Sequence, residues 1–180
     1  MPNQKPVGSD PEAFTELYET YYLRIYQYMR YRCSNDHSAE DLTAQVFERI
    51  LIHLQRYQPG EAPLEAWIFT IAANCFKDAY RRQKLITWLN LDFLKYLPSR
   101  QTAPEDQIVQ NENHREIQSA LALLSDRERD VIAWRFGARL TNRQISGISN
   151  LSEQNVAVIL FRALRKLKQG FINKQEVKHV

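Results

Sequence analysis

Apolar side chains recur at three- and four-residue spacing along most of the chain, the period at which one face of an α-helix is buried. The spacing predicts helices over residues 14–32, 39–54, 64–83, 115–124, 126–136, 142–148 and 153–170. Polar stretches with proline, glycine or asparagine separate them. The pattern therefore predicts an all-α chain.

The helices at 39–54 and 64–83 form a predicted hairpin across a loop that contains Pro59 and Gly60. We expect Ser38 to cap the first helix, with Asp41 three residues further on. One face of each helix is apolar: Leu42, Val46, Phe47, Ile50, Leu51 and Leu54 in the first, and Leu64, Trp67, Ile68, Ile71, Ala72, Cys75 and Ala79 in the second. Taken alone, this pattern indicates only a helical hairpin with an apolar core and a basic end.

The C-terminal part contains two capping boxes and a tight turn. Ser125 with Glu128, and Thr141 with Gln144, have the spacing that opens a helix. We expect Gly137 to end the first of these helices and Asn150 to adopt the left-handed conformation in the turn after the second. The predicted inward residues are Ile117, Leu121, Leu124, Val131, Ile132, Trp134, Phe136, Ile145 and Ile148. A short helix, a tight turn and a longer basic helix together predict a helix-turn-helix.

The last helix, which Ser152 is placed to cap, has two distinct faces. Its inward stripe is Val156, Leu160, Ala163 and Leu167, and its outward face holds Ala157, Val158, Phe161, Arg162, Arg165 and Lys168. Amides can bond adenine and an apolar group can touch a thymine methyl, so Gln154, Asn155 and Val158 are candidate base contacts. Arg162 and Arg165 suit phosphates better than bases.

A linker separates two predicted small helical domains, which span residues 11–84 and 113–172. The linker, 85–112, begins with an apolar stretch that predicts an amphipathic helix over 85–97 and then becomes polar. Because an exposed apolar helix of this density is a liability in a free monomer, we expect it to pack on one of the domains or on a partner.

Composition adds little beyond a local charge asymmetry. The net charge of the 180 residues is only +3, but six Lys and Arg oppose one acid from Gln154 to the end, which is typical of a nucleic-acid-facing end or of a solvated helix face. Cys33 and Cys75 have no CxxC partner and are interpreted as ordinary thiols in a cytoplasmic protein. We expect no catalytic constellation, metal site, cofactor, signal peptide or membrane span, and therefore not an enzyme.

The order of several short motifs along the chain resembles that of a known protein family. The motifs AEDLT-x-x-VF, A-W-I-F-x-I-A-x-N and D-x-x-RR, followed by S-E-x-x-V and RALRKL, resemble the second and fourth regions of bacterial RNA polymerase sigma factors, with the closest similarity to the extracytoplasmic-function (ECF) group. The resemblance implies a dissociable subunit that binds polymerase core and directs initiation by recognising and melting promoter DNA. It leaves open whether an anti-sigma factor binds the chain.

The resemblance also implies three groups of site residues. Polymerase core would contact Glu40, Asp41, Gln45 and Glu48. The promoter −10 element would contact Tyr57, Gln58, Asn74, Lys77, Arg81 and Arg82, with Tyr57 and Gln58 holding a flipped base. The −35 element would contact Arg143, Gln154, Asn155, Val158, Arg162 and Arg165.

Two departures from the family pattern bear on these sites. The chain has Ala44-Gln45 where a Gln-Glu pair is usual, which removes one carboxylate from the polymerase-facing surface. It has Ala157, Val158 and Ile159 where polar or basic residues are usual, which favours shape-based reading of the −35 element. The alternatives are a two-domain helix-turn-helix regulator and a polymerase-binding adaptor that reads no DNA.

Overall fold

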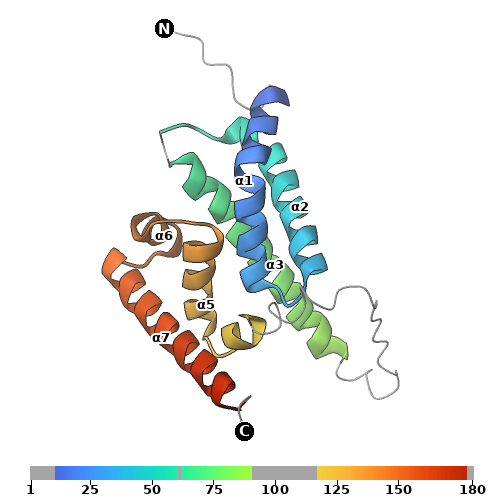
Figure 1. Cartoon of the computed structure of the whole chain (residues 1–180). Coiled ribbons are helices and arrows are strands. Elements are labelled where there is room, and N and C mark those ends of the chain that lie inside the picture. The colour runs from blue at the N-terminus through green and yellow to red at the C-terminus, as the bar shows by residue number, and fades with distance from the viewer. Residues whose placement is uncertain (1–10, 61, 91–116, 178–180) are drawn as a thin grey trace.

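The computed structural model describes residues 11–60, 62–90 and 117–177, and over these residues the chain is helical without a strand. The first half comprises α1 (Pro11–Arg32), α2 (Asp36–His53), the 3₁₀ turn η2 (Leu54–Arg56) and α3 (Leu64–Asn90). The second half comprises α5 (Asp126–Ile132), the π turn η4 (Ala133–Gly137), α6 (Asn142–Ser149) and α7 (Glu153–Val177). Figure 1 shows α5 lying between the bundle of α1, α2 and α3 and the outer helix α7. The prediction of an all-α chain with two helical domains is confirmed.

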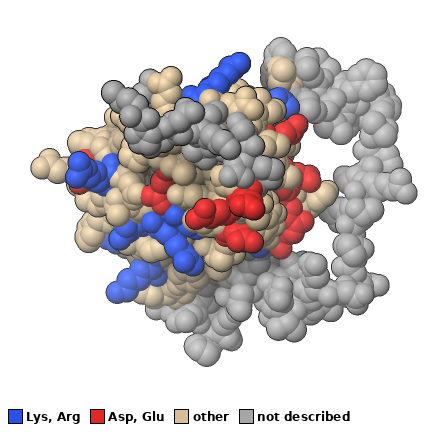
Figure 2. Space-filling view, turned by 90° about the horizontal axis from the view of Figure 1, so that it is seen from above, with Lys and Arg blue, Asp and Glu red and all other residues tan. Residues whose placement is uncertain are grey.

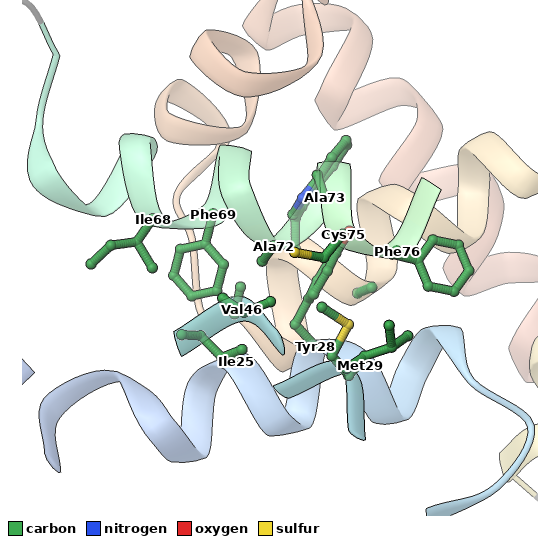
Figure 3. Close-up of a cluster of buried hydrophobic side chains, with 14 of the residues drawn as sticks. Ile25, Tyr28, Met29, Val46, Ile68, Phe69, Ala72, Ala73, Cys75 and Phe76 are labelled. Carbon is green, nitrogen blue, oxygen red and sulfur yellow. The ribbon is translucent and has the colours of Figure 1, made fainter. Parts of the chain in front are cut away.

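The core of the first half lies where α1, α2 and α3 meet (Figure 3). Its largest fully buried side chains are Ile25, Tyr28, Met29, Val46, Ile50, Leu54, Ile68 and Phe69. Each apolar side chain of this size contributes about 1.5–3 kcal/mol on burial. The two cysteines are buried at the same core, and burial raises the pKa of the Cys33 thiol to about 11. The prediction that Cys75 is a buried thiol is confirmed.

Two helix boundaries differ from the predictions. The N-cap of α2 is Asn35, whose side-chain oxygen accepts a hydrogen bond of 2.8 Å from the Ser38 amide. Ser38 therefore lies inside the first turn, and the prediction that it caps the helix was wrong. Helix α3 continues through Asn90, so residues 85–90 extend it rather than begin a separate linker helix. The rest of the predicted linker, 91–112, lies outside the described residues.

Both capping boxes of the second half are present. The Glu128 carboxylate accepts hydrogen bonds of 2.9 Å from the Ser125 amide and hydroxyl, and Gln144 does the same for Thr141 at 2.8 Å. Glu128 also pairs with Lys166 of α7 at 2.8 Å, and this bond lowers the pKa of the carboxyl. The left-handed conformation predicted for Asn150 is confirmed, with φ at 56°.

Three predicted inward residues are exposed. Leu51, Ile117 and Phe136 have 53%, 45% and 44% of their surfaces accessible, so placing them in the core was wrong. Each lies at the edge of an apolar stripe, where helical spacing alone cannot distinguish a buried position from a rim position.

One hydrophobic cluster joins the two halves. Val131, Trp134, Ala138, Leu140 and Ile145 of the second half are buried in the same cluster as the core of α1, α2 and α3. Gly137 makes the closest approach, because a Cβ added to it would lie 2.8 Å from both the Cα and the backbone nitrogen of Tyr28. Gly137 is thus required for contact between the halves, and the left-handed residue after η4 is instead Arg139, with φ at 57°.

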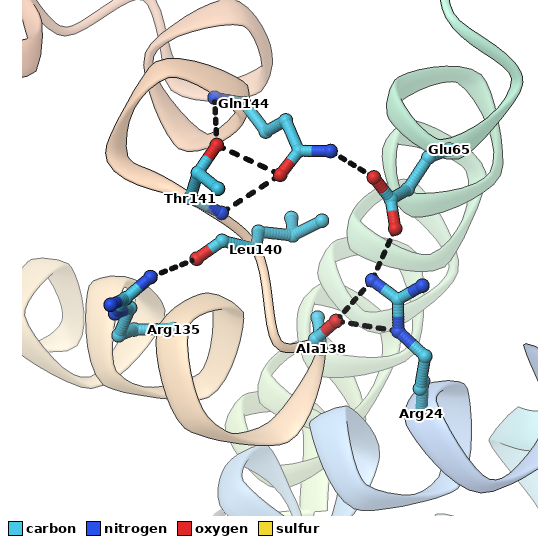
Figure 4. Close-up of polar contacts among 7 residues, drawn as sticks. All are labelled: Arg24, Glu65, Arg135, Ala138, Leu140, Thr141 and Gln144. Carbon is cyan, nitrogen blue, oxygen red and sulfur yellow. Dashed lines mark hydrogen bonds and ion pairs between the residues drawn. The ribbon is translucent and has the colours of Figure 1, made fainter.

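Polar contacts join the halves at the edge of this cluster (Figure 4). The Arg24 guanidinium donates two hydrogen bonds, of 2.8 and 2.6 Å, to the Ala138 carbonyl, and it also pairs with the Glu65 carboxylate. Glu65 accepts a hydrogen bond from the Gln144 side chain. Since Gln144 belongs to the capping box of α6, this chain of contacts connects α1 and α3 directly to the start of the helix-turn-helix. We call Arg24, Glu65 and Gln144, together with the Ala138 carbonyl, the polar clasp.

Candidate nucleic-acid and protein interfaces

The predicted polymerase-facing residues lie on two sides of α2. Glu40 and Glu48 line a groove of about 380 Å³ between α1 and α2, together with Phe14, Tyr18, Tyr22, Ala44, Phe47 and Leu51. Asp41 and Gln45 face the other way, into a hollow of about 600 Å³ whose wall also includes Arg32, Tyr80 and Arg129. All four side chains are exposed, so α2 presents an acidic ridge between two hollows rather than one flat patch.

The groove between α1 and α2 is aromatic. The ring centroid of Tyr18 lies 4.6 Å from that of Phe47, and Tyr22 stacks on Tyr26 at 6.3 Å. Tyr18 and Tyr22 remain 42% and 37% exposed. Tyrosine combines an apolar ring with a polar hydroxyl, so this surface can bury apolar area against a protein partner while its hydroxyl groups keep polar contacts.

The loop after η2 is built on Tyr57. Its hydroxyl donates a hydrogen bond of 2.9 Å to the Ala62 carbonyl, and its ring lies 5.1 Å from the Trp67 ring. Gly60 takes a φ of +134°, a conformation that other residues rarely adopt. The loop therefore has a fixed base, from which the side chain of Gln58 extends into solvent. The predicted stacking of a flipped base on Tyr57 stays a prediction.

The outer face of α3 carries the remaining predicted −10 contacts. Asn74, Lys77 and Arg81 follow at helical spacing, and all three are exposed, as is Arg82. An amide followed by three cations on one exposed helix surface can bond a base edge and several phosphates. Trp67 is half-buried against the core, as predicted, and lies two turns before Asn74 on α3.

The second half presents α7 as the outer helix of a helix-turn-helix. Val156 and Ala163 are fully buried, and Leu160 and Leu167 pack on the two hydrophobic clusters, so the predicted inward stripe is confirmed. The predicted −35 residues Arg143, Gln154, Asn155, Val158, Arg162 and Arg165 are all exposed. In the face drawn in Figure 2, most acidic side chains lie toward the right and a group of basic ones toward the lower left, with further basic side chains along the upper edge. Exposed acids occur along α1 and α2, and exposed cations along α6 and α7.

Models of two protein-family regions match the chain. Residues 17–86 match Sigma-70 region 2, and residues 120–169 match Sigma-70, region 4. Together these segments cover most of the described structure, in the order and on the domains already delineated. The chain belongs to the sigma-70 family.

Individual members of the family support the assignment over nearly the whole length. The ECF RNA polymerase sigma factor SigM of Bacillus subtilis is 29% identical over 153 residues, which cover 85% of this chain and 91% of SigM. SigX of the same organism is 28% identical over 162 residues, covering 88% of this chain and 83% of SigX. The family assignment favours an RNA polymerase sigma factor over a two-domain regulator.

Solved structures share the fold. CnrH in complex with the cytosolic domain of CnrY matches with a TM-score of 0.69 at 20% identity, covering 91% of this chain and 90% of that chain. The sigma factor RpoE in complex with the anti-sigma factor NepR from Bartonella quintana matches with a TM-score of 0.66 at 17% identity, covering 89% and 97%. No helix within the described part of this sigma factor has the length and apolar character needed to span a bilayer.

Sequence reasoning missed two features of the sigma factor. The polar clasp joins residues 114 and 79 positions apart, and nothing in local spacing signals it. Phe161 was placed on the outward face of the last helix but not among the DNA contacts, although it is the most exposed large apolar side chain among the described residues, at 67%. Its position directly before Arg162 and one turn before Arg165 was the available signal.

Proposed function

We propose that this sigma factor binds polymerase core through the acidic ridge of α2, the −10 element through the Tyr57 loop and α3, and the −35 element through α7. The observation that supports this division is that every residue assigned to the three surfaces is at least partly accessible, although the two halves share a core. Promoter melting would take place at the loop and α3, where Gln58 and Asn74 offer amides to unpaired bases.

The arrangement must open on a promoter. The −10 and −35 elements are about 25 base pairs apart, which is roughly 85 Å along B-DNA. A compact body of this chain length has a radius of gyration of about 16 Å and cannot place α3 and α7 on both elements at once. We therefore infer that the contact between Gly137 and Tyr28 and the polar clasp break when the sigma factor engages both elements.

The proposed role is regulatory: the sigma factor directs the polymerase to promoters, and the polymerase carries out RNA synthesis. We place its action in the cytoplasm, where polymerase core and chromosomal DNA are found.

The polymerase-binding surface is tested by charge reversal. Asp41→Arg should prevent co-elution with polymerase core while leaving the circular dichroism melt nearly unchanged, because the side chain is exposed and its contact with His37, at 3.8 Å, is exposed as well. Glu16→Arg is the matched control, since it reverses an exposed acid of α1 outside both hollows. If the Asp41→Arg variant is folded and co-elutes with polymerase core to the same extent as the Glu16→Arg control, this assignment is excluded.

The −10 surface is tested by permanganate footprinting of the melted region. Losing the Asn74 amide should cost about 1–3 kcal/mol of open-complex stability, whereas Gln169→Ala, an exposed amide on α7, should cost nothing. Footprints of Asn74→Ala that match wild type would place the melting contacts elsewhere.

A further inference from the structure

The outward face of α7 is apolar where a recognition helix would enter DNA. Val158, Phe161 and Leu164 are 46%, 67% and 42% exposed, and all lie within the first half of the helix. Single exposed apolar side chains are ordinary on protein surfaces. A group of three such side chains within seven residues is unusual on the exposed side of the outer helix of a helix-turn-helix. Exposed apolar surface of this kind marks a contact site.

The neighbours of this patch indicate its partner. Arg162 and Arg165 lie beside Phe161 and are exposed, and neither has an ion pair within the part of the chain that the structure describes. Lys166, one residue further on, turns inward and bonds Glu128. The two outward cations are thus available for phosphates beside an apolar strip, a combination that suits the major groove of DNA better than an apolar protein surface.

We propose that Phe161, with Val158, reads the −35 element through the C5-methyl groups of thymine. This inference rests on the proposed function and names how that site discriminates between bases. In the major groove only thymine presents a methyl group, and an apolar side chain distinguishes it from cytosine and from the purines. The Phe161 ring projects furthest into solvent, so it makes the principal contact, while Val158, one turn earlier, touches the neighbouring pair.

The usual polar contacts cannot replace this one. At residues 157–161 the helix offers Ala157, Val158, Ile159, Leu160 and Phe161, none of which donates a side-chain hydrogen bond. Gln154 and Asn155 reach only the base pairs nearest the helix start. Thymine methyl contacts therefore supply the discrimination over the next turn of the helix.

Deoxyuridine tests the proposal without altering the protein, because it differs from thymidine only by the missing methyl group. The probe is a fluorescent duplex carrying the −35 sequence that wild-type holoenzyme enriches from a random library, with each thymidine replaced in turn. We expect replacement at one or two positions to weaken holoenzyme binding about fourfold each, the value of one buried methyl group at ~0.8 kcal/mol. At those positions, Phe161→Ala holoenzyme should bind the two duplexes equally.

The matched control is Phe171→Ala, which removes an exposed aromatic ring from the same helix beyond the proposed contact. It should keep the full preference for thymidine. If wild-type holoenzyme binds the thymidine and deoxyuridine duplexes equally at every position, the proposal is overturned. The enriched sequence would still show that the holoenzyme recognises a −35 element. The proposal is also overturned if Phe161→Ala keeps the preference, or if it lowers affinity for polymerase core while leaving the preference intact. Failure of holoenzyme to enrich any −35 sequence would overturn the proposed function as well.

Discussion

Replacing Gly137 by alanine should force the two halves of the sigma factor apart. The new methyl group would lie 2.8 Å from the Tyr28 Cα, 2.8 Å from the Tyr28 nitrogen and 3.0 Å from the Gln27 carbonyl carbon. These are backbone atoms in the last third of α1, so no rotamer change relieves the overlap. Every overlapping atom belongs to the first half, and the least costly response is therefore separation at the interface.

The size of the effect follows from the cost of overpacking. Inserting a methyl group into a closed contact costs about 1–3 kcal/mol. For a chain of this length that corresponds to a fall in melting temperature of roughly 2–12 °C. Gly147→Ala is the matched control, because a Cβ there meets nothing within 4 Å and the residue lies inside α6. Alanine at residue 147 should raise stability by about 0.5–1 kcal/mol through helix propensity.

Two measurements check this expectation. A thermal melt gives the stability difference, and energy transfer between fluorophores on cysteines introduced at exposed residues 20 and 169 reports the distance between α1 and α7. The native thiols of Cys33 and Cys75 are buried with raised pKa values, so they label slowly. Gly137→Ala with a wild-type melt and unchanged energy transfer would refute the assigned role of this glycine.

Three further substitutions test other contacts. Asn35→Ala should lower the free energy of unfolding in urea by about 0.5–2 kcal/mol, and Ser38→Ala should lower it much less. An equal loss for the two variants would contradict the assignment of Asn35 as the N-cap. Arg24→Ala removes hydrogen bonds from a charged group, which contribute about 1.5–3 kcal/mol to stability. It should also lower the energy transfer between fluorophores at residues 20 and 169. Unchanged energy transfer would contradict a role of the polar clasp in holding the two halves together. Glu128→Gln should lower the free energy of unfolding of the protein at pH 7. Because the Lys166 bond lowers the Glu128 pKa below 4.5, the wild-type advantage should be complete above that pH and disappear as pH falls through the lowered value, and a pH-independent gap would contradict this.

Local features of the fold could be predicted from the sequence because their determinants lie within one or two turns. The capping boxes at Ser125 and Thr141 and the left-handed Asn150 each depend on residues no more than three positions apart. Asn35 and Ser38 show the limit of this reasoning, since both residue types cap helices and only the observed helix start separates them.

Long-range features could not be predicted in the same way. The prediction that Gly137 ends its helix is confirmed, since η4 ends there, but its close approach to α1 was not predicted. The clasp pairs Arg24 with a carbonyl 114 residues away, and a carbonyl has no sequence signature. The candidate site residues were predictable in large part because the family motifs fix their places, and Phe161 was not, because the motif does not specify an aromatic residue there.

The most direct test of the assignment is initiation by purified polymerase core on a library of promoter-length templates, with and without this chain, followed by sequencing of the transcript starts. We expect the chain to produce transcripts from templates that share two sequence blocks, about 25 base pairs apart between their centres, with starts at a fixed distance downstream. Asp41→Arg protein should produce none of them. Identical transcripts with and without the chain, on templates that the chain nevertheless binds alone, would contradict a sigma factor and indicate a regulator that binds operators.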